Sequence, residues 1–239
     1  MLFRNKLILV AGPTGLIGSH LIRRLLVEGA RVRATHWKRE LPLRDAALEA
    51  MRVDLTRGDD CRRAVRDVEW VFLCAAGTFG AGDMATTPMT HVTPNLLIDS
   101  QMLHTAYEAG VAKFIWLSST VAYPPGERPM KEEQMFDGEP FEKYYFAGWT
   151  KRFTEILCRM YGGKLQRTMA TLVLRPTNVY GPDDDFEFAT SHVIPALIRK
   201  VVERWDPLEV WGDGCEVRDA IYVDDMVEAM VLAAQKLDR

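Results

Sequence analysis

Short apolar runs alternate with amphipathic segments along most of this 239-residue chain. The continuously apolar run Leu7–Ala11 predicts a buried strand. The segment Leu16–Glu28 has apolar residues at helical spacing and predicts a helix, which Gly29 ends. The same criteria predict further strands at Arg31–Thr35, Arg52–Asp54, Val68–Ala75, Lys113–Ser118, Thr168–Leu174 and Leu208–Trp211. They predict further helices at Asp59–Arg66, Leu96–Ala109, Gly148–Tyr161, His192–Arg204 and Met226–Lys236.

This repeated order of strand and helix is typical of an α/β fold in which a doubly wound parallel sheet carries helices on both faces. The Pro-, Gly- and Asp-rich stretch Tyr180–Asp185 indicates a boundary. We therefore predict a large sheet domain over residues 1–180, to which residues 219–239 return. Residues 181–218 are predicted to form a small, shortened second region.

Composition narrows the possible partners. Lys and Arg number 30 and Asp and Glu number 33, so the formal net charge is −3. The chain lacks the excess of basic residues that would predict nucleic-acid binding. No apolar run is long enough to predict a membrane span. The cysteines form no CxxC pair and have no His at ligand spacing, so we expect reduced thiols, no metal site and a cytoplasmic protein. They are Cys61, Cys74, Cys158 and Cys215.

A glycine-rich turn joins the first predicted strand to the first predicted helix. Its sequence is Gly12-Pro13-Thr14-Gly15-Leu16-Ile17-Gly18. Glycine permits the tight turn and a close approach of the backbone to a pyrophosphate, and the helix N-terminus offers free N–H groups to the phosphates. Strand, turn and helix in this order predict a Rossmann-type site for a nicotinamide dinucleotide over the turn.

The end of the second predicted strand favours NADP over NAD. An NAD site usually has an acidic residue there to bind the ribose 2′-hydroxyl, but this chain has none before Glu40. Lys38 and Arg39, together with His36, could instead pair with a 2′-phosphate. A solvated basic loop is the alternative, and NAD stays open.

A series of short motifs then follows in a fixed order along nearly the whole chain. The motifs are Gly12–Gly18, Val53–Leu55, Cys74–Gly80, Leu117–Pro124, Leu174–Pro182, Ser191–Leu197, Val210–Gly214, Arg218-Asp219 and Val223–Asp225. This series resembles the extended short-chain dehydrogenases/reductases, and among them the NAD(P)-dependent nucleotide-sugar epimerase/dehydratase family. The resemblance implies a Rossmann domain with an NADP or NAD cofactor and a nucleotide-sugar substrate.

The resemblance also implies roles by position. Ser119 falls at the catalytic Ser/Thr position, Lys151 at the catalytic lysine, and His192 where some members carry an acid or base for epimerisation. The implied cofactor contacts are Asp54 and Leu55 at the adenine, Ala75, Ala76 and Gly77 at the central stretch, and Lys151, Pro176 and Asn178 near the nicotinamide. The implied substrate contacts are Ser119, Thr120, Asn178, His192, Trp211 and Arg218.

Each of these residues also has a structural interpretation. The hydroxyls after the strand could cap it, Lys151 could be solvated, and Trp211 could belong to the core. Arg218 could pair with a neighbouring aspartate, and a single histidine such as His192 is more often structural. The joint occurrence of the motifs in order favours the functional interpretation.

One position departs from the family. Its members have Tyr four residues before the lysine, where the ammonium lowers the tyrosine pKa, but this chain has Ala147 there. Three explanations stay open. The alanine is an engineered substitution, Tyr144 or Tyr145 acts from the preceding loop, or the protein binds its ligands with slow, altered or no redox chemistry.

A second departure is the end of the sequence at Arg239, shortly after Val223–Asp225, where family members normally continue with further substrate-domain chain. We expect an open sugar pocket, a pocket completed by a partner, or a longer parent protein.

From these observations we expect an NAD(P)-dependent nucleotide-sugar epimerase/reductase of the 4-keto-6-deoxy type, impaired if Ala147 has no substitute. The alternative is a non-catalytic sensor of NAD(P) or a nucleotide-sugar with the same fold. The resemblance further implies a homodimer formed through the helices at Leu96–Ala109 and Gly148–Tyr161, although their apolar residues could equally be core.

Overall fold

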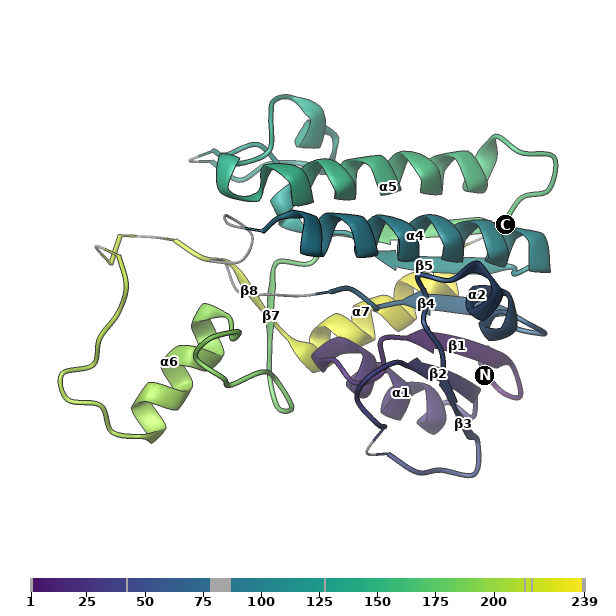
Figure 1. The fold of residues 1–239 in the computed structure, drawn as a ribbon, viewed down its shortest axis with the longest axis horizontal. Coiled ribbons are helices and arrows are strands. Elements are labelled where there is room, and N and C mark those ends of the chain that lie inside the picture. Colours follow the sequence, from purple (N-terminus) through teal and green to yellow (C-terminus); the bar gives the residue numbers. More distant parts are fainter. Residues whose placement is uncertain are drawn as a thin grey trace.

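A six-stranded parallel sheet forms the centre of the structure (Figure 1). The computed structural model describes residues 2–41, 43–77, 87–126, 128–212, 214–215 and 217–237. The strand order is β3-β2-β1-β4-β5-β6. After β3, the chain crosses back to the other side of β1, where β4, β5 and β6 follow in turn. The strands are β1 (Leu7–Ala11), β2 (Arg31–His36), β3 (Leu48–Arg52), β4 (Trp70–Leu73), β5 (Lys113–Leu117) and β6 (Ala170–Leu174).

Alternate residues of the central strand β1 face two separate cores. Ile8 and Val10 pack into the core beneath α1 and α7, whereas Leu9 and Ala11 pack into the core beneath α2, α4 and α5. The helices are α1 (Leu16–Val27), α2 (Gly58–Ala64), α4 (Met89–Ala109), α5 (Tyr145–Gly163), α6 (Val193–Val202) and α7 (Val223–Lys236). With helices on both faces of a parallel sheet, the predicted Rossmann-type α/β class is confirmed.

An arm extends from the carboxyl edge of this sheet. Strands β7 (Asn178–Tyr180) and β8 (Ala220–Tyr222) form a small parallel pair, and α6 lies beyond them, apart from the main sheet (Figure 1). The side chains of Thr177 and Asn178 both donate hydrogen bonds to the carbonyl of Asp219, each at 2.8 Å. The chain then enters α7, which packs against α1. The division of the chain into two regions remains a prediction.

A histidine of α1 ties the arm to the sheet domain. His20 Nδ1 lies 2.7 Å from Asp224 Oδ1 and His20 Nε2 lies 3.0 Å from the carbonyl oxygen of Pro182. Asp183 next to Pro182 also pairs with Arg23 of α1, at 2.9 Å.

Two predicted strands were wrong. The prediction at Arg52–Asp54 lies four residues too late, because β3 is the half-exposed edge strand Leu48–Arg52 and lacks a continuous apolar run. Residues Leu208–Trp211 form no strand, because they are exposed and no described strand pairs with them.

The helix ends also differ from the prediction. Helix α4 begins seven residues before the predicted start at Leu96, and Pro94 lies inside its first turns, where proline usually ends a helix. Helix α5 begins at Tyr145 rather than at Gly148, which places Ala147 inside its first turn. None of the described helices is long and apolar enough to cross a membrane.

Candidate functional site

The glycine turn is packed so closely that two of its glycines have no space for a side chain. Gly12 has a φ of +83°, and a Cβ there would lie 2.6 Å from the backbone nitrogen of Ala75 at the end of β4. A Cβ on Gly18 would lie 2.1 Å from the carbonyl oxygen of Gly12. Gly15 differs, because its nearest atom would be 3.8 Å away and the glycine is exposed. The turn is therefore rigid on its inner side and open on its outer side.

The N-terminus of α1 opens at this turn. The first bond within the helix joins the Ser19 N–H to the Gly15 carbonyl at 3.0 Å, so the N–H groups of Leu16, Ile17 and Gly18 have no acceptor within the helix. No side chain caps them at Gly15. These N–H groups and the positive end of the helix dipole form a cradle that suits a pyrophosphate.

Basic side chains gather beside the ends of β2 and β3. The predicted residues Lys38 and Arg39 are exposed, and His36 is half-buried. Arg52, which no sequence motif indicated, pairs in register with His36 across the two strands and stacks over the Trp37 ring at 5.8 Å. Only the strand register, which an apolar pattern does not give for an edge strand, could have placed Arg52 there.

The two predicted adenine contacts lie just beyond β3. Asp54 Oδ1 accepts hydrogen bonds from both the backbone N–H and the hydroxyl of Thr56, at 3.0 and 2.7 Å. Leu55 is buried and belongs to the core under α2. Both residues therefore hold the turn in place, and their adenine contact remains a prediction.

An asparagine of α4 holds the loop after β4. Asn95 Oδ1 accepts the Gly77 N–H at 2.7 Å, and Asn95 Nδ2 donates to the Gly77 carbonyl at 3.2 Å. Ala75, Ala76 and Gly77 are the predicted cofactor contacts of this loop, whereas no sequence motif includes Asn95. The motif residues Thr78–Gly80 and Asp213 lie outside the described residues.

The predicted catalytic residues lie at the end of β5 and on α5. The Ser119 hydroxyl accepts the Val121 N–H at 3.3 Å, so it caps a short turn and keeps its own proton for donation. Thr120 is exposed, and Ser118 is buried with no described partner for its hydroxyl. The capping interpretation therefore holds for Ser119 without excluding a contact to substrate.

Lys151 is half-buried and directed inward rather than solvated. Its Nζ donates to the Leu117 carbonyl at 2.8 Å and lies 4.5 Å from the centre of the Trp116 ring. Burial lowers the pKa of Lys151, while the charges of Asp99 and Glu155 raise it. The ammonium is thus fixed at the carboxyl end of β5. Ser119 follows the last residue of this strand by two positions.

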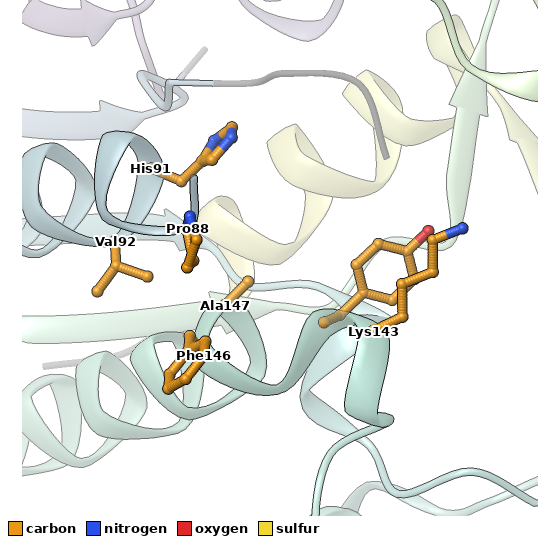
Figure 2. A pocket seen from close by; sticks show the side chains of 7 residues that line it. Pro88, His91, Val92, Lys143, Phe146 and Ala147 are labelled. Carbon is orange, nitrogen blue, oxygen red and sulfur yellow. The ribbon is translucent and has the colours of Figure 1, made fainter. Parts of the chain in front are cut away.

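A small pocket lies beside Ala147, near the start of α5. Figure 2 shows Ala147 of α5 directed toward Pro88, which precedes α4, with His91 of α4 beyond it. Tyr144 also lines it, whereas the Tyr145 ring packs against Phe146 and Trp149 outside it, with ring centres 5.5 and 6.4 Å apart. The lining residues are Pro88, His91, Val92, Lys143, Tyr144, Phe146 and Ala147. The structure therefore separates the two candidate tyrosines.

The predicted substrate residues of the arm lie in the segment between β7 and β8. His192 precedes α6 and is exposed, Trp211 is 80% exposed and so is not core, and Arg218 is exposed. Pro176 is half-buried after β6, and the Asn178 amide is held by the Asp219 carbonyl. On the cofactor side, the described contacts join the glycine turn to Ala75 and the Gly77 backbone to Asn95.

A buried ion pair supports the site from below. Arg175, directly after β6, binds Glu155 of α5 through two hydrogen bonds of 2.8 and 2.7 Å. Its remaining nitrogen donates to the Tyr123 hydroxyl at 2.7 Å and to the Glu132 carbonyl at 2.8 Å. Glu155 lies one helical turn after Lys151, so Arg175 links β6, α5 and the loop after Ser119.

The fold and this arrangement define a class: a Rossmann-type α/β protein with a glycine turn and an inward-directed lysine at one edge of the sheet. The model of the NAD dependent epimerase/dehydratase family matches residues 8–239. The chain belongs to this family.

Two groups of relatives show the range within the family. GDP-L-fucose synthase 1 from Arabidopsis thaliana is 32% identical over 95% of this chain and 68% of its own length. The structure of MoeE5 in complex with UDP-glucose and NAD has a TM-score of 0.82 and 29% identity, covering 97% of this chain and 73% of MoeE5. A GDP-L-fucose synthetase from Naegleria fowleri bound to NADP has a TM-score of 0.76 over 96% and 73% of the two chains; at 24% identity it shows the common fold.

The glycine turn yields a prediction that separates folding from binding. Gly18→Ala forces a Cβ onto the Gly12 carbonyl, so we expect a loss of about 1–3 kcal/mol in the free energy of unfolding together with weaker NADPH binding. Gly15→Ala meets no protein atom closer than 3.8 Å and should keep its stability within about 1 kcal/mol. Its Cβ nevertheless enters the space above the turn, so NADPH affinity should fall at least about tenfold.

Urea unfolding and titration calorimetry with NADPH measure the two effects. A Gly15→Ala protein that binds NADPH as tightly as the natural sequence would show that the pyrophosphate does not lie across this turn.

Proposed function

We propose that this protein is an NADP(H)-dependent nucleotide-sugar epimerase/reductase that acts on 4-keto-6-deoxy sugars. The main support is the placement of the phosphate cradle at Gly12–Gly18 and the pair Ser119 and Lys151 on the carboxyl edge of one sheet. The chain's membership of the family and its own similarity to a GDP-L-fucose synthase support a nucleotide-sugar substrate.

The residues present suit the cofactor. The cradle has free N–H groups for a pyrophosphate, and Asn95 holds the Gly77 backbone at the adjoining edge. When bound, the nicotinamide supplies a hydride. In this proposal Ser119 donates a hydrogen bond to the sugar oxygen at C4, and the Lys151 ammonium stabilises negative charge that develops beside it.

Tyr144 is our candidate for the proton donor that replaces the family tyrosine. Tyr144 lines the pocket beside Ala147, and Ala147 lies one helical turn before Lys151. The Tyr145 ring instead packs against Phe146. On the arm, we propose that His192, Trp211 and Arg218 contact the nucleotide-sugar, with Thr120 and Asn178 on the side of the sheet.

Ala147 favours a second function, a non-catalytic sensor of NADP or a nucleotide-sugar. The methyl group of Ala147 supplies no hydroxyl at the position that carries the general acid in the family. Binding of NADP or a nucleotide-sugar does not require a general acid. The two functions differ in turnover and share ligand binding.

The primary assay follows nicotinamide absorbance while purified protein and NADPH are mixed with GDP- or dTDP-4-keto-6-deoxy sugars. We expect oxidation of NADPH. Tyr144→Phe should lower kcat/KM by about 10²–10⁴-fold because the proton donor is lost. Tyr145→Phe is the matched control, since it also removes one hydroxyl, from the neighbouring residue at the start of α5, but should leave kcat/KM unchanged.

The contrary outcomes are distinct. If the natural protein binds NADPH without turnover and the Ala147→Tyr protein turns over substrate, the sensor function is supported and the enzyme function is contradicted. Equal activity of the Tyr144→Phe and Tyr145→Phe proteins would exclude Tyr144 as the donor.

We propose NADP rather than NAD as the natural cofactor. The support is the exposed basic group Lys38, Arg39 and Arg52 beside β2, with no acidic residue before Glu40. A hydrogen bond from Thr190 lowers the pKa of the Asp185 carboxyl on the arm, and the charge of Arg39 adds to this effect. Lys38 and Arg52 are therefore the cations chosen for substitution.

Replacing Lys38 and Arg52 by Ser should weaken NADPH binding about 10–100-fold, because hydrogen bonds between charged groups are lost. NADH binding should stay within about twofold, since NADH has no 2′-phosphate. Arg62→Ser, a change at an exposed basic residue of α2, is the control. Equal losses for NADPH and NADH, measured by calorimetry, would contradict the assignment.

We also propose a homodimer formed through α4 and α5, which lie side by side (Figure 1). Phe146, Phe153 and Ile156 are each about half exposed and form a stripe at helical spacing along α5. Exposed apolar stripes of this kind commonly mark interfaces. The proposal includes a cytoplasmic location, which free thiols support and cell fractionation would test.

Phe153→Glu should convert a dimer into a monomer in sedimentation velocity, because it places a charge in the centre of the stripe. Val27→Glu changes a residue of α1 that is 82% exposed and should leave the dimer intact. A natural protein that sediments as a monomer at micromolar concentration would refute this interface.

A further inference from the structure

We propose that Asp99 of α4 is a positioning residue that keeps Lys151 protonated and in place, acting through the indole ring of Trp116. The proposal rests on the function proposed above for Lys151, and it adds a residue that lies outside the ligand site. No motif of the sequence drew attention to Asp99.

The geometry links three side chains through one indole ring, with Asp99 at the edge of the ring and Lys151 over its face. The Trp116 Nε1–H donates to Asp99 Oδ1 at 3.0 Å, and the Lys151 Nζ lies over the same indole, 4.5 Å from its centre. The second carboxylate oxygen of Asp99 accepts the Thr154 hydroxyl at 3.2 Å. Asp99 is 3% exposed and Trp116 1% exposed, so water does not compete with these contacts.

The negative charge of Asp99 and the positive charge of Lys151 are placed so that both interact favourably with the Trp116 ring. A carboxylate that accepts the indole N–H adds negative potential to the ring, and an ammonium is attracted to the face of such a ring. The Leu117 carbonyl, 2.8 Å from Lys151 Nζ, fixes the ammonium on the other side. The lysine is therefore clamped between the last two residues of β5.

Other charged groups near Lys151 are already balanced. Glu155 forms its two hydrogen bonds with Arg175, and burial raises the pKa of the Cys158 thiol, so it stays neutral. The hydrogen bonds described for Asp99 come only from the neutral donors Trp116 and Thr154. Lys151 is thus the cation that compensates the buried charge of Asp99.

The two buried groups depend on each other for their ionisation. Burial raises the pKa of the Asp99 carboxyl, and the nearby Lys151 charge opposes this change. Burial lowers the pKa of Lys151, and the Asp99 charge opposes that change. Removing the charge of Asp99 leaves Lys151 with its burial penalty and one compensating charge fewer.

Asp99→Asn tests the proposal, because asparagine keeps the size of the side chain and an oxygen that can accept the Trp116 N–H. The measurement is the pH titration of the Lys151 Nζ signal by NMR in lysine-labelled apoprotein, assigned with Lys151→Met. We expect Lys151 in Asp99→Asn to lose its proton at a pH lower by on the order of one unit, as for the loss of one nearby opposite charge. Thr154→Val, which removes a hydrogen bond to Asp99 but keeps its charge, is the control and should shift the titration much less.

Trp116→Phe provides a second test should the asparagine variant fail to fold. Phenylalanine keeps a ring face for the ammonium but loses the N–H to Asp99, so the Lys151 titration should again move to lower pH. An unchanged Lys151 titration in either folded variant overturns the proposal.

In the active protein the same shift has a defined sign. Activity that needs the Lys151 ammonium falls as the pH rises through the Lys151 pKa, so Asp99→Asn should move the alkaline limb of the pH profile to lower pH. A purely structural loss lowers activity at every pH without moving this limb. A shifted titration in a protein without turnover on any keto-sugar would refute the proposed reaction alone, whereas an unmoved titration in an active protein would refute the role of Asp99 alone.

Discussion

The close approach of three backbone segments at the carboxyl edge of the sheet is the constraint on which the site depends. Gly12, Gly18 and Ala75 meet so tightly that no side chain fits on either glycine. This contact fixes the start of α1 relative to the end of β4, and so directs the free N–H groups of the helix toward the space above both strands. A dinucleotide laid across that space meets rigid backbone rather than mobile side chains, which reduces the entropy lost on binding.

On the other side of this edge, rigidity comes from buried charge. Arg175 holds Glu155 through two hydrogen bonds, and Asp99 accepts a hydrogen bond from the Trp116 ring whose face Lys151 contacts. Removing one member of a buried pair leaves an unpaired charge, which typically costs about 3–5 kcal/mol. These pairs therefore do little for net stability when intact, but they strongly disfavour any arrangement in which α5 moves away from β5 and β6.

The sequence predicts most of the sheet because continuous apolar runs such as Leu7–Ala11 match the buried strands. The glycine turn is equally predictable, since its requirement is local. It does not predict β3, whose residues are half-exposed at an edge, nor Asn95 and Asp99, which are isolated polar residues inside a helix. The roles of the two helix residues arise from contacts with segments between 17 and 55 positions away, and no local pattern encodes such contacts.

The arm follows a different principle from the sheet edge. Helix α6 lies apart from the main layers, while the base of the arm is held by the Asp219 carbonyl and by His20, whose two ring nitrogens bind Asp224 and the Pro182 carbonyl. Since His20 belongs to the helix that carries the phosphate cradle, the arm is anchored to the cofactor side of the site. A rigid cofactor edge with an arm attached at its base lets the sugar side vary in shape without disturbing the cradle. That separation fits a family whose relatives bind different nucleotide-sugars on one fold.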